Sequence, residues 1–306
     1  MNLGTYRGIR VKVHVAFLLL LIVLAFLERL PETLTLFGIV LVHELAHVIT
    51  ARRHGQRVQE IELLPFGGVA RIEEPLSVNP AVEKSVAIAG PLANLFLVGV
   101  GFIFLTYEVL QPAWVNFFIE ANAILGLFNM LPALPLDGGR IYRARLVERI
   151  GFGRATERVV SLGKILSIVM IGMGGVGLAT GLFNASLVVL GFFTYIAANK
   201  EQAMSFFVLF RYLTRKKEEM QENATLRVRQ LAVGADARIR DVYNQLVPRH
   251  YHMILVIGEA GEMIGIATEA DLIDGLLNYG IDTPIRKFAR KMVACRGATP
   301  DEATNE

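Results

Sequence analysis

Six apolar segments, each close to the length of a membrane span, dominate the sequence and restrict the folds open to it. A soluble domain of 306 residues has no reason to be 53% hydrophobic with a mean hydropathy of +0.47. We therefore expect a polytopic α-helical membrane protein with six transmembrane helices, and we disfavour a large soluble α/β protein with buried helices. The segments cover roughly residues 13–30, 34–51, 86–107, 114–131, 162–182 and 184–198.

Basic residues gather in alternate connections between these segments. The other connections, near residues 28–33, 108–113 and 183–184, hold one Arg in total. Positively charged loops stay on the cytoplasmic side, so we expect a multi-pass protein of the cell membrane with both termini in the cytoplasm. The first segment lacks the small-residue pair of a signal-peptidase site, and we expect it to be retained. The basic side carries Arg7, Arg10, Lys12, Arg52, Arg53, Arg57, six Arg from Arg140 to Arg158, Lys200, Arg211, Arg215, Lys216 and Lys217.

The second apolar segment contains His43-Glu44-Leu45-Ala46-His47. Two histidines four residues apart lie on one face of a helix, so their imidazoles can bind one metal ion. Glu44 could then take a proton from a metal-bound water. Ionisable side chains at the centre of a span cost roughly 2.5–3.5 kcal/mol each, which calls for a compensating role. The alternative is a polar cluster that only ties helices together.

A catalytic zinc site needs a third protein ligand, because such sites have three and one open position for water. Depth in the membrane favours Asp137 over Glu120, and His14 is interpreted as a structural or interfacial residue rather than a ligand. His47 precedes Arg52 by five residues and Asp137 precedes Arg140 by three, so both lie in the inner leaflet. Glu120 lies near the outer end of its segment. The candidates within or near a span are His14, Glu120 and Asp137.

The chain around Asp137 cannot form a regular helix throughout. Pro132 and Pro135 interrupt the helix, and Gly138-Gly139 leave the chain free to turn. Irregular backbone at membrane depth is tolerated where it is buried in protein or lines a wet cavity. A protease needs such a cavity, because water is a reactant.

Residues 57–72 are too short and too polar to span a membrane. Their partial alternation is broken by Pro65-Phe66-Gly67-Gly68, which indicates a hairpin or a looped-in edge strand. Such a strand could pair with an extended substrate, although a purely structural re-entrant loop explains the pattern equally well.

Together these motifs resemble the site-2 protease family of intramembrane metalloproteases. The resemblance covers roughly residues 5–200 and includes Gly90-Pro91-Leu92-Ala93-Asn94 and Asn129-Met130-Leu131-Pro132. It implies one zinc ion on His43, His47 and Asp137, and Glu44 as general base. It also implies transmembrane or membrane-associated protein substrates, contact with lipid and no nucleic acid. Asn94 and Asn129 match family positions and could bind substrate or bridge helices.

A soluble unit is expected after a charged linker at residues 211–224. Residues 225–282 are predicted to form a strand, a helix, two strands and a helix, with Thr268 as the cap of the last helix and Asp271 in its first turn. This stretch resembles a cystathionine-β-synthase (CBS) type module, a fold that commonly binds adenine nucleotides. Thr268 and Asp271 match positions that contact nucleotide, and helix capping explains them equally well. Such modules work in pairs, so residues 283–306 could begin an incomplete second copy, or a homodimer could supply the partner.

Residues 1–210 are thus expected to form a metalloprotease domain that hydrolyses membrane proteins. A membrane transporter or channel with a cytosolic nucleotide-sensing module is the alternative, but it leaves the His-Glu-His spacing and the matching depth of Asp137 unexplained. A further alternative is a metal-binding scaffold without proteolytic activity, and the intact Glu44 counts against it. The single cysteine, Cys295, excludes an internal disulfide and a multi-cysteine metal site.

Overall fold

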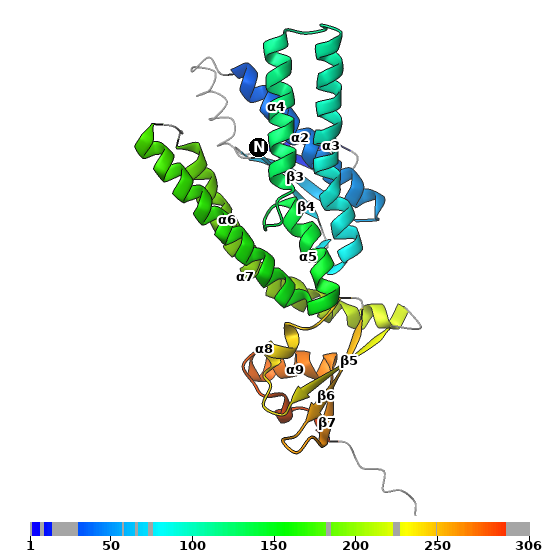
Figure 1. Cartoon of the computed structure of the whole chain (residues 1–306). Coiled ribbons are helices and arrows are strands. Elements are labelled where there is room, and N and C mark those ends of the chain that lie inside the picture. The colour runs from blue at the N-terminus through cyan, green and yellow to red at the C-terminus, as the bar shows by residue number, and fades with distance from the viewer. Residues whose placement is uncertain are drawn as a thin grey trace, which may run out of the picture. The chain divides into compact units, whose positions relative to one another are not determined.

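The computed structural model divides the chain into two compact units, Met1–Phe210 and Arg211–Glu306 (Figure 1). It describes residues 2–6, 9–13, 30–56, 58–64, 67–72, 76–181, 185–222, 227–248 and 250–291. Nearly all of the expected first span, including His14, lies outside these ranges, as does Cys295.

The first unit is built mainly from long helices. Within the described residues, three helices are long and apolar enough to cross a membrane: Pro31–Arg53, Pro80–Thr106 and Phe152–Thr180. Large apolar side chains are exposed along them, as at Phe96 (72%) and Val176 (66%), which an apolar surrounding would cover. The helices are α2 (Leu30–Arg53), α3 (Pro80–Thr106), α4 (Pro112–Asn129), α5 (Asp137–Ile150), α6 (Phe152–Thr180) and α7 (Ser186–Glu222).

Five of the six expected apolar segments coincide with α2, α3, α4, α6 and α7 to within about two residues at the ends that extend beyond a helix. Helix α4 is continuous, although Asn116, Glu120 and Asn122 interrupt its apolar sequence, and α7 continues through the charged residues 211–222. The continuation has a local cause, because residues 192–222 contain no Gly or Pro and many strong helix formers. Helix α5 was not expected from the sequence.

A four-stranded sheet accompanies the helices, with strand order β1-β2-β3-β4. Strands β3 and β4 pair antiparallel, which confirms the hairpin expected at residues 57–72, and β2 pairs parallel with β3. Strand β4 is an edge strand that packs along α2. The strands are β1 (Asn2–Tyr6), β2 (Ile9–Val13), β3 (Val58–Leu64) and β4 (Gly67–Ile72), with a short 3₁₀ helix, η1 (Leu76–Val78), before α3.

The second unit has a mixed sheet of order β5-β6-β7-β8, in which β5 and β6 are parallel and the other pairs antiparallel. Alternate residues of β6, including Ile254 and Val256, are buried, as the period of a half-buried strand requires. The elements are β5 (Val228–Gly234), α8 (Ile239–Tyr243), β6 (Tyr251–Ile257), β7 (Met263–Thr268), α9 (Glu269–Tyr279), η2 (Ile285–Lys287) and β8 (Arg290–Lys291). The start of the 283–306 segment therefore joins this sheet, and Ile285 is fully buried. The rest of that segment lies outside the described residues.

Candidate active site

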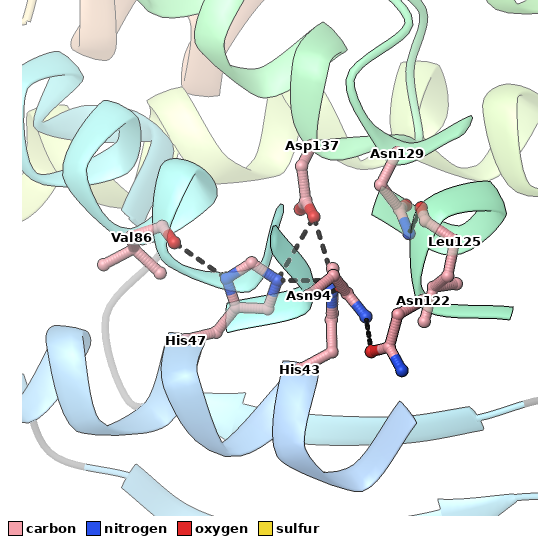
Figure 2. Close-up of polar contacts among 8 residues, drawn as sticks. All are labelled: His43, His47, Val86, Asn94, Asn122, Leu125, Asn129 and Asp137. Atoms are coloured by element: carbon pink, nitrogen blue, oxygen red, sulfur yellow. Dashed lines mark hydrogen bonds and ion pairs between the residues drawn. The ribbon is translucent and has the colours of Figure 1, made fainter. Parts of the chain in front are cut away.

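Two helices bring His43, His47 and Asp137 together in the first unit. The histidines lie one helical turn apart on α2, and Asp137 is the first residue of α5. The Nε2 atoms of the two histidines are 3.1 Å apart, and Oδ2 of Asp137 lies 3.1 Å from Nε2 of His43 and 3.2 Å from that of His47 (Figure 2). All three residues are buried.

The irregular segment between α4 and α5 places Asp137. Its Leu134 is fully buried, and the Leu134 N–H donates to the carbonyl of Val159 on α6. Gly138 and Gly139 form the first turn of α5, where a Cβ atom would collide with the backbone of Met130 or Ala133. The two glycines therefore allow the segment to pack against the helix start, whereas the sequence suggested that they let the chain turn.

Gly90 allows α3 to approach the three side chains. A Cβ atom at this position would lie 2.5 Å from Nε2 of His47 and 2.6 Å from Nε2 of His43. Carbon and nitrogen atoms in ordinary contact are separated by about 3.5–4.0 Å. Any larger residue at position 90 would thus displace α3 or the imidazole rings.

Acceptor groups on α3 orient both imidazoles. Nδ1 of His47 lies 2.7 Å from the carbonyl oxygen of Val86, and Nδ1 of His43 lies 2.5 Å from Oδ1 of Asn94. Both oxygens accept hydrogen bonds, so each Nδ1 carries the proton in the neutral imidazole and each Nε2 presents its lone pair. This tautomer is the one in which Nε2 can bind a metal ion.

The three converging atoms fit a zinc ion. Each Nε2 atom presents a lone pair, and the Asp137 oxygen beside them is part of a carboxylate. These three electron-rich atoms repel one another, and only a cation or added protons can offset that repulsion. Tetrahedral zinc with bonds of about 2.0–2.1 Å separates its ligand atoms by about 3.3 Å, close to the 3.1–3.2 Å found here. Among the described residues, these three form the group of His, Cys, Asp or Glu side chains able to hold a metal.

A cavity of about 700 Å³ opens beside this group. Its walls are mostly apolar side chains of α2 and α4, and its polar lining includes Glu44, Glu120, Asn129 and Arg140. Glu44 follows His43 directly on α2, so a carboxylate faces the space beside the candidate ligands. The sequence placed Glu120 away from the site, near the outer end of its helix; in the structure it lines the same cavity.

The asparagines have different environments. Asn129 lines the cavity, and its Nδ2 donates to the carbonyl of Leu125 at 3.1 Å. Asn94 is fully buried and bridges α2 and α4, because its Nδ2 also donates to Oδ1 of Asn122 at 3.0 Å (Figure 2). Sequence reasoning missed Asn122, and it identified Gly90 only as part of the Gly90–Asn94 motif, without the role found here. The seven-residue spacing of Asn122 and Asn129, which places both on similar faces of α4, could have drawn attention to the first.

In the second unit, Thr268 and Asp271 form the N-terminal capping box of α9. The Thr268 N–H and O–H donate to Oδ2 of Asp271 at 2.8 and 2.7 Å, and the Asp271 N–H donates to Oγ1 of Thr268. Arg290 donates twice to Oδ1 of Asp271. Burial acts to raise the pKa of the Asp271 carboxyl, but the bonds from Thr268 and Arg290 outweigh it, and its pKa lies below the ordinary value.

Comparison with known proteins agrees with this geometry. The sequence model of peptidase family M50 matches residues 32–113 and 106–173, which include His43, Glu44, His47 and Asp137. The structure of a site-2 protease from Methanocaldococcus jannaschii is 30% identical and covers 66% of this chain and 94% of its own, with a TM-score of 0.54. The chain belongs to the site-2 protease family, M50.

Two further proteins are similar to this chain in sequence. A zinc metalloprotease of Methanocaldococcus jannaschii is 27% identical over 93% of this chain and 86% of that protein. Stage IV sporulation protein FB of Bacillus subtilis is 32% identical over 47% of this chain and 51% of that protein. This M50 chain is therefore a zinc metalloprotease and a membrane protein, and the transporter or channel alternative is wrong.

Proposed function

We propose that the protein hydrolyses peptide bonds of transmembrane or membrane-associated proteins at a site within the bilayer, as in regulated intramembrane proteolysis. The observation that carries this proposal is the convergence of His43, His47 and Asp137 beside a cavity, with two of them on a helix long and apolar enough to span a membrane. Water and an extended substrate could both reach such a site only through a space of this kind.

In this proposal His43, His47 and Asp137 hold the zinc ion, and each imidazole is held in place by its bond to α3. When bound, zinc supplies the Lewis acidity that peptide hydrolysis needs near neutral pH. The Glu44 carboxylate accepts a proton from the attacking water and delivers it to the leaving amine. Asn129 contacts a substrate carbonyl from the cavity wall, whereas the buried amide of Asn94 serves His43.

The walls of the cavity suit an apolar substrate segment. A helical substrate hides its carbonyl groups in its own hydrogen bonds, so it must unwind before cleavage. Edge strand β4 packs along α2, and we propose that the β3–β4 hairpin is re-entrant and pairs with the unwound segment. Around this site we propose six transmembrane helices in the cell membrane, with both termini cytoplasmic, as the distribution of Arg and Lys favours.

Two substitutions in the full-length protein test the assignment. In proteoliposomes that contain a single-span test substrate, Glu44→Gln should retain zinc and lose cleavage, because the ligands remain and the proton acceptor does not. Asp137→Ala should lower the zinc content. The same Glu→Gln change at Glu157, exposed on α6, is the control. Normal cleavage by Glu44→Gln would refute the role of Glu44, and full zinc content in Asp137→Ala would refute the ligand set. Trapping of uncleaved single-span regulators by Glu44→Gln would identify substrates.

For the second unit we propose a CBS-type module that binds an adenine nucleotide through Thr268 and Asp271 and regulates proteolysis, with a homodimer formed through the module. The order of strands and helices and the position of Thr268, where β7 meets α9, support this proposal. Isothermal titration of the full-length protein with AMP and ATP tests it. Asp271→Ala should weaken binding, and absence of binding by the unaltered protein would refute it.

A further inference from the structure

A chain of three side chains runs from a backbone carbonyl of α4 to His43. Nδ2 of Asn122 donates to the carbonyl oxygen of Phe118 at 2.8 Å. Oδ1 of Asn122 accepts from Nδ2 of Asn94 at 3.0 Å, and Oδ1 of Asn94 lies 2.5 Å from Nδ1 of His43 (Figure 2). These hydrogen bonds thus connect α4, α3 and α2 at the level of the candidate metal site.

The direction of every bond in this chain follows from its first member. The Phe118 carbonyl can only accept, so the Asn122 NH₂ group must face it and the Asn122 oxygen must face Asn94. That oxygen also can only accept, so Asn94 presents its NH₂ group to Asn122 and its oxygen to His43. The imidazole then has to donate from Nδ1, which leaves the lone pair on Nε2.

His47 is held in the same tautomer by a direct contact with a backbone carbonyl. Its Nδ1 faces the Val86 carbonyl directly at 2.7 Å, and that oxygen dictates the tautomer without an intermediary. The two imidazoles therefore each depend on a backbone carbonyl, one through direct contact and one through two amides. A side-chain amide alone would not suffice for His43, because Asn can rotate and offer either its oxygen or its nitrogen.

Burial strengthens the constraint. Asn94 and Asn122 are both 0% exposed, so water cannot replace a bond that is lost or reversed. A reversed Asn94 would place its oxygen against the oxygen of Asn122, unless Asn122 reversed as well and brought its own oxygen to the Phe118 carbonyl. Unsatisfied or opposed polar groups in such surroundings are costly.

We propose that Asn122 is a positioning residue for the zinc ion: it sets the orientation of the Asn94 amide and so keeps His43 in the tautomer whose Nε2 can bind metal. This inference rests on the proposed ligand set of His43, His47 and Asp137. Asn122 lies outside the histidine motif and the Asp137 segment, and it reaches His43 through its hydrogen bond to Asn94.

Zinc affinity of the full-length protein tests the proposal, measured by competition with a chromophoric chelator in detergent. Loss of groups that support a metal ligand typically lowers affinity by about 10- to 100-fold, and we expect about tenfold for Asn122→Leu, which keeps the side-chain size. Ser167→Ala is the control, because Ser167 is also fully buried and also bonds a carbonyl four residues earlier, that of Gly163 on α6. It should bind zinc as the unaltered protein does.

A double-mutant cycle separates positioning from packing. In Asn94→Asp, a carboxylate offers His43 only acceptor atoms, so the tautomer no longer depends on Asn122. Asn122→Leu should then change zinc affinity by less than about twofold. Unaltered affinity in the single Asn122→Leu variant, or an equal loss in both backgrounds, would overturn the proposal. Failure of the unaltered protein to bind zinc would instead refute the ligand set itself.

Discussion

Replacement of Gly90 by alanine should weaken zinc binding without unfolding the protein. The added Cβ would lie 2.5 Å from Nε2 of His47 and 2.6 Å from Nε2 and Cε1 of His43. Ordinary contacts are about 3.5–4.0 Å, so either α3 or both rings must move by about 1 Å. Strain of this kind costs about 1–3 kcal/mol. If zinc binding bears that cost, affinity falls roughly 5- to 150-fold, because about 1.4 kcal/mol corresponds to a factor of ten.

Helix α3 provides its own control for this experiment. Gly99 lies on the same helix, and a Cβ atom there would meet nothing within 4 Å. Both variants make the same chemical change within a helix, so any general effect of alanine on α3 is shared. Zinc affinity is measured by chelator competition, and retention of the fold by thermal unfolding in detergent. Equal zinc affinities for Gly90→Ala and Gly99→Ala would refute the close approach of α3 to the histidines.

Two further predictions concern charged groups. Arg143→Ala should destabilise the first unit by about 3–5 kcal/mol, because it leaves Glu83, which is 2% exposed, without the guanidinium it pairs with. Thermal unfolding measures this loss. Recovery of stability in the double variant Glu83→Leu/Arg143→Met would show that the unpaired charge is the cause. The second unit should lose stability as pH falls below about 4, since the lowered pKa of Asp271 contributes stability that is present above its unfolded value of about 3.9 and is lost on protonation. Hydrogen exchange of α9 against pH measures this effect, and an unchanged pH profile in Asp271→Asn would contradict it.

The parts of the site that depend on spacing along one helix could be predicted from the sequence. The separation of His43 and His47 is a property of α2 alone, and the basic residues at the ends of the apolar segments gave the depth of Asp137. The roles of Gly90 and Asn122 could not be predicted in this way, because they depend on how closely α3 packs against α2 and α4. Glu120 was assigned by depth only, whereas the cavity extends over several turns of α4 and reaches it.

Local sequence patterns predicted most of the fold of the first unit, and they failed where tertiary packing overrides local preference. Apolar runs indicated five of the helices, and the Pro65-Phe66-Gly67-Gly68 motif indicated the hairpin. Helix α5 was missed because its first turn contains Gly138 and Gly139, which disfavour a helix in isolation. Tertiary packing overrides that preference, since only glycine fits against the backbone of Met130 and Ala133.

One stripe of α3 serves the whole centre. Glu83, Val86, Gly90 and Asn94 follow one another at intervals of three or four residues, so they share a face of that helix. They bond Arg143 of α5, bond His47, make room for both imidazoles and bond His43, respectively. The histidine motif of α2 consequently depends on α3 for the arrangement of its side chains. A chimaera that exchanged α2 between two such enzymes would keep the geometry of the metal site only if this face of α3 were exchanged with it.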